Sequence, residues 1–267
     1  MRGIEHRVAI VSGGASGIGA GVARRLVEFG ARVVVGDIVD TDGQALADAL
    51  GPACLYQHAD LRSDAELGAL VEYTVRMFGG VDFLINAACT YRDSGAAAQR
   101  AEWLDCFDVN VFGHVVLLQH AREHLRRSDA ASVVNFTTEA AHAGLAGRWV
   151  YPAAKAAIEQ LTRSQALDLA EDGIRVNSVL HGWTRKPMHD TAPPEVLAEY
   201  DRWAKRLHML GRLGTLQEAS DAVLFLCSAH ASFITGSCLV ADGGHSALGP
   251  QARDKVLPTQ LRSRRRR

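Results

Sequence analysis

The fold is decided by residues 8–19, which read Val8-Ala9-Ile10-Val11-Ser12-Gly13-Gly14-Ala15-Ser16-Gly17-Ile18-Gly19. The apolar run at the start is typical of a strand that is buried on both faces. A glycine turn follows, and the spacing of Val22 and Leu26 then predicts a helix. Glycines allow close backbone approach, and a helix N-terminus offers free N–H groups and a positive dipole. Strand, glycine turn and helix in this order therefore predict a phosphate-binding site.

A second buried strand, residues 32–36, ends in an acid, Asp37. It lies about 20 residues beyond the glycine turn, where a carboxylate can accept hydrogen bonds from the ribose diol of adenosine. The same carboxylate would repel a 2′-phosphate, and neither Ala15 nor Ile38 supplies a cation to hold one. We therefore expect NAD rather than NADP as the cofactor. An Asp that only caps the following turn is the alternative.

Apolar strands and helical patterns alternate along the rest of the chain, with strands expected near residues 54–57, 81–86, 132–137, 174–179 and 238–241. Seven such strands separated by helices predict an α/β fold, a single-domain doubly wound (Rossmann) parallel sheet with helices on both faces. One long helix is expected from about Ala101 to Arg127. No linker or repeat interrupts the pattern, so residues 1–245 are expected to form one domain.

The last segment, residues 246–267, is a basic tail with seven Lys and Arg against one Asp, whereas the whole chain has a net charge of −1. It could be an arm for nucleic acid, but no aromatic residues interleave with its charges. A solvated, flexible tail is the favoured interpretation, and a nucleic-acid partner is disfavoured.

Composition is that of an ordinary globular protein, with 48% hydrophobic and 22% charged residues. No apolar run approaches the roughly 18 residues of a membrane span, and no leader pattern is visible. We expect a cytoplasmic protein without a membrane partner. The five cysteines are scattered and the histidines form no ligand motif, so reduced thiols and no metal site are expected.

Tyr151 and Lys155 lie four residues apart in an alanine-rich helical pattern. Residues at this spacing share a helix face, so the phenol and the ammonium can point into one site. A nearby ammonium favours the phenolate and would lower the pKa of the tyrosine toward neutrality, where it can exchange protons. The spacing alone is weak evidence, because it occurs by chance on many helices.

Residues from about Glu5 to Gly244 resemble the short-chain dehydrogenase/reductases. The resemblance rests on several ordered segments, namely residues 12–19, Asn-Ala-Ala-Cys at 86–89, Asn110, the Tyr151/Lys155 pair, residues 173–179, Ile234-Thr235-Gly236 and Asp242-Gly243-Gly244. It implies an oxidoreductase that transfers a hydride between NAD(H) and a secondary alcohol or ketone. An epimerase or dehydratase that keeps its nucleotide bound, or a non-catalytic NAD-binding scaffold, remains as an alternative.

The resemblance also assigns roles. Tyr151 would exchange the proton with the substrate oxygen, and Lys155 would bind the nicotinamide ribose. Asn110 would hold a water in the proton relay, and Thr138 takes the place of the family's serine. The implied cofactor-binding residues are Gly13, Ser16, Gly17, Ile18, Gly19, Asp37, Ile38, Asp60, Leu61, Asn86, Tyr151, Lys155 and Thr184.

Two departures from the family pattern concern the nicotinamide end. His181 replaces a proline, which leaves the backbone there less restrained. Lys186 stands where a threonine is usual, and its ammonium could pair with a cofactor phosphate or point to solvent.

The substrate is expected to meet residues 89–92, 142–149 and the long insert 183–213, which is helical in pattern and long enough to be a lid. Arg92, Arg148 and Arg185 could bind an anionic group or could be solvated. The insert's histidines are expected on its polar surface. The apolar stretch 109–118 and the small residues 153–158 favour a homo-oligomer, a tetramer or dimer, with a thicker core as the alternative.

Overall fold

The computed structural model describes residues 1–185 and 192–249. A seven-stranded parallel sheet in the order β3-β2-β1-β4-β5-β6-β7 forms its centre, which confirms the predicted doubly wound fold. Lys186, the implied substitute for a threonine, and residues 250–267 of the basic tail lie outside the described residues. The strands are β1 (Val8–Ser12), β2 (Arg32–Asp37), β3 (Cys54–His58), β4 (Phe83–Asn86), β5 (Ser132–Thr137), β6 (Arg175–His181) and β7 (Cys238–Ala241).

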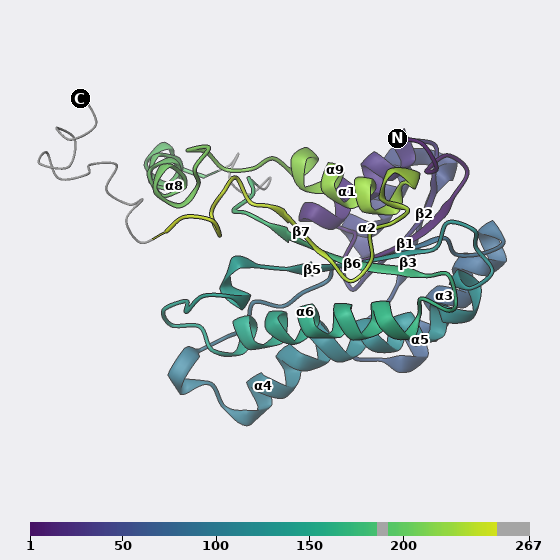
Figure 1. Cartoon of the computed structure of the whole chain (residues 1–267), viewed down its shortest axis with the longest axis horizontal. Helices are drawn as coiled ribbons and strands as arrows, with labels where there is room; N and C mark the ends of the chain where they lie inside the picture. Colours follow the sequence, from purple (N-terminus) through teal and green to yellow (C-terminus); the bar gives the residue numbers. More distant parts are fainter. Residues whose placement is uncertain (186–191, 250–267) are drawn as a thin grey trace, which may run out of the picture.

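Helices cover both faces of the sheet, as Figure 1 shows. The α-helices are α1 (Gly17–Glu28), α2 (Asp40–Leu50), α3 (Asp64–Phe78), α4 (Arg100–Phe107), α5 (Gly113–Leu125), α6 (Val150–Asp168), α8 (Pro194–Leu207) and α9 (Leu216–Cys227). One layer holds α1, α2 and α9, and the other holds α3, α5 and α6, with α4 outside α6. None of the described helices is both long and apolar enough to cross a membrane.

Each face of the sheet has its own apolar core. Alternate residues of a strand point to opposite faces, so Ala9 and Val11 of β1 pack under α1 and α9, whereas Ile10 packs under α3 and α5. All five residues of β1 and all four of β4 are buried. Burial on both faces explains why these strands read as continuous apolar runs rather than as alternating patterns.

The connection from β3 to β4 crosses the sheet, so that β1 lies between β2 and β4. The loops after β1 and β4 therefore leave the sheet in opposite directions, and the crevice between them is where a doubly wound sheet binds its ligand. The topology thus places the glycine turn after β1 beside the segment that follows β4.

The long helix expected from Ala101 to Arg127 is not uniform. It comprises α4, one π-helical turn over Asp108–Phe112 and α5. A π-helical turn inserts one residue into the ladder and is frequent at functional sites. The insert is helical at α8, as its pattern predicts, and α8 stands apart from the main layers, beside the carboxyl ends of the strands (Figure 1).

Candidate active site

A cavity of about 510 Å³ opens at the carboxyl ends of the strands, in the crevice between the β1 and β4 loops. Most of the cofactor-binding residues implied by the sequence line it. They are Gly13, Ser16, Gly17, Ile18, Gly19, Asp37, Ile38, Asp60, Leu61, Tyr151 and Lys155. The fold therefore brings residues from positions 13 to 155 to one cavity. The glycine turn between β1 and α1 lines it, and so does Asp37 at the end of β2.

The glycine turn has the shape that a dinucleotide needs. A Cβ on Gly13, whose φ is +68°, would lie 2.3 Å from Ala88 Cα, and one on Gly19 would lie 2.1 Å from the Gly13 oxygen. A Cβ on Gly17 would meet nothing within 4 Å, so this residue borders open space in the cavity. The turn is closed against the protein and open toward the start of α1, which fits a pyrophosphate on the helix N-terminus.

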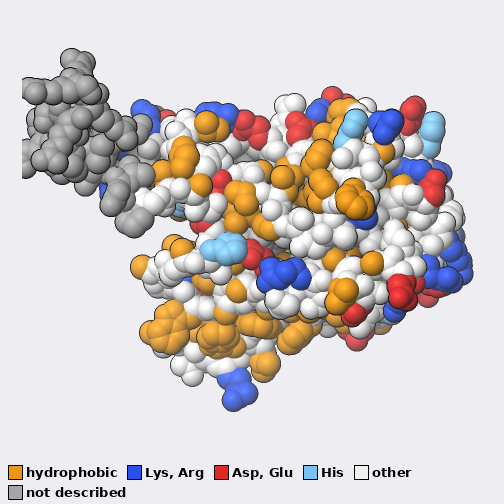
Figure 2. All heavy atoms as spheres, in the orientation of Figure 1, with side chains coloured by type: hydrophobic (Ala, Val, Ile, Leu, Met, Phe, Trp, Pro, Cys, Tyr) orange, Lys and Arg blue, Asp and Glu red, His pale blue; other side chains and the backbone are white. Residues whose placement is uncertain are grey.

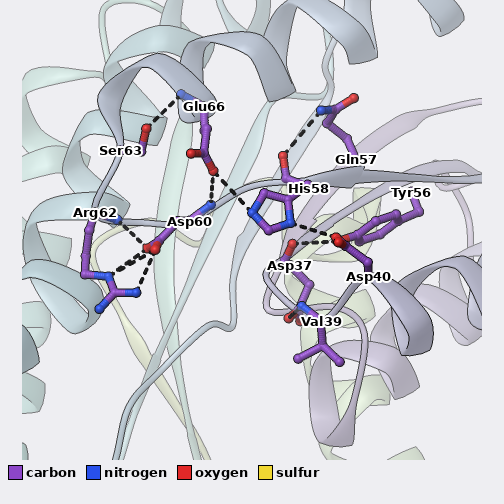
Figure 3. Close-up of polar contacts among 10 residues, drawn as sticks. All are labelled: Asp37, Val39, Asp40, Tyr56, Gln57, His58, Asp60, Arg62, Ser63 and Glu66. Carbon is purple, nitrogen blue, oxygen red and sulfur yellow. Dashed lines mark hydrogen bonds and ion pairs between the residues drawn. The ribbon is translucent and has the colours of Figure 1, made fainter.

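Asp37 is held rigidly at one end of this cavity. Its Oδ2 accepts a hydrogen bond from Ala15 N (3.0 Å) and its Oδ1 accepts one from Val39 N (3.1 Å). Figure 3 shows this end of the site with its surrounding polar contacts. Because a carboxylate has about four acceptor positions, Asp37 keeps capacity for two ribose hydroxyls.

Further carboxylates make this end acidic (Figure 3). The Tyr56 hydroxyl donates to Asp40 Oδ1 (2.6 Å) and also lies 2.8 Å from Asp37 O, and His58 Nδ1 lies 2.7 Å from the same Asp40 oxygen. The Arg62 guanidinium pairs with Asp60 at 2.7 Å and with Asp105 at 3.2 Å, which lowers the pKa of Asp60. Arg62, the cation in the lining near Asp37, is thus already paired with two acids.

Asn86 and Asn110 lie behind the cavity rather than in its lining, and both are fully buried. Asn86 Nδ2 donates to Asn135 Oδ1 (2.8 Å), while Asn86 Oδ1 is buried without a hydrogen-bond partner among the described residues. Asn110 sits in the π-helical turn and binds both backbone groups of Thr90, at 2.8 and 2.9 Å. In this structure it therefore anchors the loop that follows β4, and its expected contact with a water stays a prediction.

Tyr151 and Lys155 project from the first two turns of α6, as their spacing predicts. The Lys155 ammonium lies 5.9 Å from the centre of the Tyr151 ring and donates to Phe136 O at 3.0 Å. Burial raises the pKa of Tyr151, and the charges of Cys89 and Glu139 raise it further, whereas hydrogen bonds with Thr138 and Tyr91 act in the opposite direction. The expected lowering of the Tyr151 pKa toward neutrality is therefore wrong, because desolvation disfavours the phenolate and also lowers the pKa of Lys155.

A second cavity, of about 330 Å³, adjoins the first, and Tyr91, Tyr151 and His181 line both. Thr138 and Thr184 line only the second. All three segments expected to meet the substrate contribute to it, through Tyr91, Leu145, Arg148, Trp183, Thr184, Tyr200 and Leu213. Tyr151 therefore stands where two cavities meet. The larger cavity contains the glycine turn, and the smaller cavity is largely apolar.

The expectation that the insert's histidines lie on a polar surface is wrong for His208. Its side chain is buried, and Nε2 accepts a hydrogen bond from Trp183 N at 3.2 Å. Burial lowers the pKa of His208, so the neutral ring is favoured. His208 supports the loop that carries Trp183 into the second cavity.

Sequence reasoning missed Asp93, which holds the start of the tyrosine helix. Its carboxylate accepts hydrogen bonds from the backbone N–H groups of Gly95, Trp149, Val150 and Tyr151, at 2.9–3.1 Å. Burial opposes the charge, but these four bonds prevail and lower the pKa of Asp93. The acid comes from the loop after β4, 58 residues before Tyr151, so no local pattern could have revealed it as a cap.

Two contacts reinforce this junction. The Arg148 guanidinium donates to the carbonyl oxygens of Tyr91 (2.8 Å) and Asp93 (3.2 Å), and the rings of Tyr91 and Tyr151 lie 5.0 Å apart. Arg148 is thus committed to the backbone of the β4 loop, which disfavours its expected alternative role in binding an anionic substrate.

We predict that Asp93→Ala weakens catalysis more than it weakens the fold. Loss of a helix cap should cost about 1–2 kcal/mol of unfolding free energy, whereas a displaced Tyr151 should lower kcat roughly ten- to hundredfold. Asp93→Asn, which keeps one acceptor oxygen, should recover part of kcat. Urea denaturation and steady-state kinetics measure the two effects.

Ser228→Ala is the matched control, because Ser228 Oγ also caps a helical turn, by accepting from His230 N at 3.2 Å, and lines neither cavity. It should lower stability without changing kcat. A wild-type kcat in Asp93→Ala would refute the positioning role.

Comparison with known proteins agrees with this geometry. Residues 13–246 match a family model described as enoyl-(acyl carrier protein) reductase. The chain is 36% identical over 240 residues to a 3-alpha-(or 20-beta)-hydroxysteroid dehydrogenase of Mycobacterium bovis, covering 89% of this chain and 88% of the relative. It is 35% identical to a cis-4-hydroxycyclohexanecarboxylate dehydrogenase of Sinomonas cyclohexanicum, covering 91% and 98%.

Among solved structures, the ligand-free aldohexose dehydrogenase of Thermoplasma acidophilum superposes with a TM-score of 0.85 at 28% identity, covering 96% of this chain and 98% of that one. The family model, the relatives and the solved structure each match most of the chain. The chain therefore belongs to the short-chain dehydrogenase/reductase family, and it is an oxidoreductase that acts on CH–OH groups with a nicotinamide cofactor.

Proposed function

We propose that this enzyme oxidises a secondary alcohol to a ketone with NAD, and that Tyr151 is the residue that takes the proton. One observation carries the proposal. Tyr151 is shared by the cavity with the phosphate turn and by the smaller cavity that contains Thr138. A substrate oxygen in the second cavity can therefore meet the phenol while its carbon faces the first.

When bound, the nicotinamide supplies a hydride acceptor for the carbinol carbon. The protein's own part is proton transfer and orientation. Tyr151 in its ionised form removes the proton from the substrate hydroxyl, and the Thr138 hydroxyl donates a hydrogen bond to the same oxygen. Lys155 lines the cofactor cavity, and its ammonium, which donates to Phe136 O, can also bind a ribose hydroxyl and offset the negative phenolate.

The acidic end of the first cavity supports NAD as the cofactor. Asp37 is fixed by two backbone N–H groups and Asp60 lies in the same lining, so a 2′-phosphate would be placed against negative charge. Arg62 is engaged by Asp60 and Asp105, so its charge is already balanced by two acids at this end of the cavity.

The second cavity supports a cyclic secondary alcohol as the substrate class. Its lining includes Ala140, Leu145, Trp183 and Leu213 beside the reacting tyrosine, and such surfaces bind hydrocarbon rings by excluding water. The two relatives named above are dehydrogenases of a hydroxysteroid and of a hydroxycyclohexane ring. An epimerase, a dehydratase or a scaffold is not favoured, because these relatives are named as dehydrogenases.

We predict that NADH absorbance rises when the enzyme is incubated with NAD and cyclic secondary alcohols, and that Tyr151→Phe lowers kcat by at least about a thousandfold. Because the phenolate is the base, oxidation should increase as pH rises through the pKa of Tyr151, which burial raises. Tyr151→Phe keeps the aromatic ring, so it should still bind NAD, and it should lose this pH dependence. Tight NAD binding without turnover of any alcohol would favour the scaffold alternative.

We predict that Asp37→Ala raises the KM for NAD roughly tenfold or more, because a charged hydrogen-bond acceptor for ribose is lost, and that it improves the use of NADP. Initial rates with both cofactors measure the change. Asp40→Ala is the matched control, since Asp40 belongs to the same acidic end but does not line the cavity. A wild-type enzyme that preferred NADP would contradict the assignment.

We also propose a homo-oligomer, a dimer or tetramer, formed through the face of α4 and the adjoining π-helical turn. Leu104 and Phe112 are 55% and 49% exposed there, and Phe107 packs between Trp103 and Phe112. Figure 2 shows hydrophobic side chains gathered over α4. Sedimentation velocity should give an oligomer that Leu104→Glu dissociates, and a monomeric wild type would refute the proposal. The cytoplasmic location stays a prediction.

A further inference from the structure

A carboxylate stands inside the otherwise largely apolar second cavity. Glu139 directly follows Thr138 at the carboxyl end of β5, and its side chain is 19% exposed. Among the described residues that line this cavity, Glu139 is the one acidic side chain. Placing a carboxylate in such surroundings costs free energy unless it is hydrogen-bonded, and neither the fold nor the proton transfer described above requires it.

The carboxylate is held next to the reacting position by donors from two segments. Glu139 Oε2 accepts from Thr138 Oγ1 at 2.8 Å, and Oε1 accepts a long hydrogen bond from Trp183 Nε1 at 3.4 Å. His245 Nδ1 lies 3.9 Å from Oε1. A carboxylate has about four acceptor positions, so Glu139 can accept from a further donor inside the cavity.

Thr138 cannot serve two acceptors with one proton. A hydroxyl has a single O–H donor, and in this structure the Thr138 hydroxyl lies 2.8 Å from Glu139 Oε2 and also in hydrogen-bond contact with Tyr151, so its one proton is already shared. To donate to the substrate oxygen it must turn away, which leaves Glu139 Oε2 without that partner. A hydrogen-bond donor on the substrate, lying one hydrogen-bond length from the reacting oxygen, would replace Thr138 as the partner of Glu139 Oε2.

We propose that Glu139 binds a second hydroxyl group, on the carbon next to the reacting carbinol, so that the preferred substrates are vicinal diols. This inference rests on the proposed function of the same site. A hydroxyl on the adjacent carbon lies at hydrogen-bonding distance from the reacting oxygen, as Glu139 Oε2 does from Thr138 Oγ1. A mono-alcohol leaves the carboxylate short of a donor, and a carboxylate-bearing alcohol is repelled by it.

Paired substrates test this directly. With the full-length enzyme and NAD, we expect kcat/KM for cyclohexane-1,2-diol to exceed that for cyclohexanol roughly ten- to hundredfold, as for a hydrogen bond to a charged acceptor. Glu139→Gln, which keeps the shape, should reduce the ratio to a few-fold, and Glu139→Leu should abolish it. Glu199→Gln on α8 is the matched control, because Glu199 is exposed and lines neither cavity. It should keep the wild-type ratio.

A binding measurement separates this inference from the proposed function. In Tyr151→Phe saturated with NAD, calorimetry should give tighter binding of the diol than of cyclohexanol, and adding Glu139→Gln should remove the difference. If this holds while the wild type oxidises neither alcohol, the proposed reaction fails and the role of Glu139 stands. The role of Glu139 is overturned and the reaction stands if both alcohols are oxidised and Glu139→Gln changes neither the diol-to-cyclohexanol ratio of kcat/KM nor the corresponding ratio of binding affinities.

Discussion

The site depends on a backbone-to-backbone contact between the turn after β1 and the segment after β4. A side chain on Gly13 would collide with Ala88, and one on Gly19 would collide with Gly13 itself. Only glycine allows this approach, because it adds no Cβ and tolerates the left-handed φ of Gly13. The contact closes one side of the turn against the protein and leaves the other side, at Gly17, open to the first cavity.

The segment after β4 then links the cofactor cavity to the chemistry. It meets the glycine turn at Ala88, is anchored by Asn110 at Thr90, and supplies Asp93 to the first N–H groups of α6. Tyr151 is thus positioned by a loop that belongs to the central strands rather than by its own helix alone. This gives a physical reason for the π-helical turn, which brings Asn110 to the loop from a helix that would otherwise run regularly.

Charge is distributed unevenly along the combined cavities. The first cavity holds Asp37 and Asp60 beside Arg62, which is paired with Asp60 and Asp105, and it also holds the buried Lys155. The second cavity holds Glu139. Burial raises the pKa of Tyr151 and lowers that of Lys155, so each group is moved toward its neutral form. The pKa of Tyr151 is therefore set first by burial and then by its immediate neighbours, Glu139 and Thr138 among them.

The sequence by itself determined the parallel sheet, the glycine turn, the acid at the end of β2 and the pairing of Tyr151 with Lys155. These features are local: apolar runs, glycine spacing and helical periodicity are encoded within a few residues. Only the tertiary structure decided which side chains connect segments that are distant in the sequence. Asp93 and Glu139 read as ordinary loop acids, His208 reads as a surface residue, and the π-helical turn is hidden in a continuous helical pattern. Their roles arise only when separate loops meet at the carboxyl ends of the strands, because the role of a partly buried acid or a buried histidine depends on the hydrogen-bond partners that the fold brings to it.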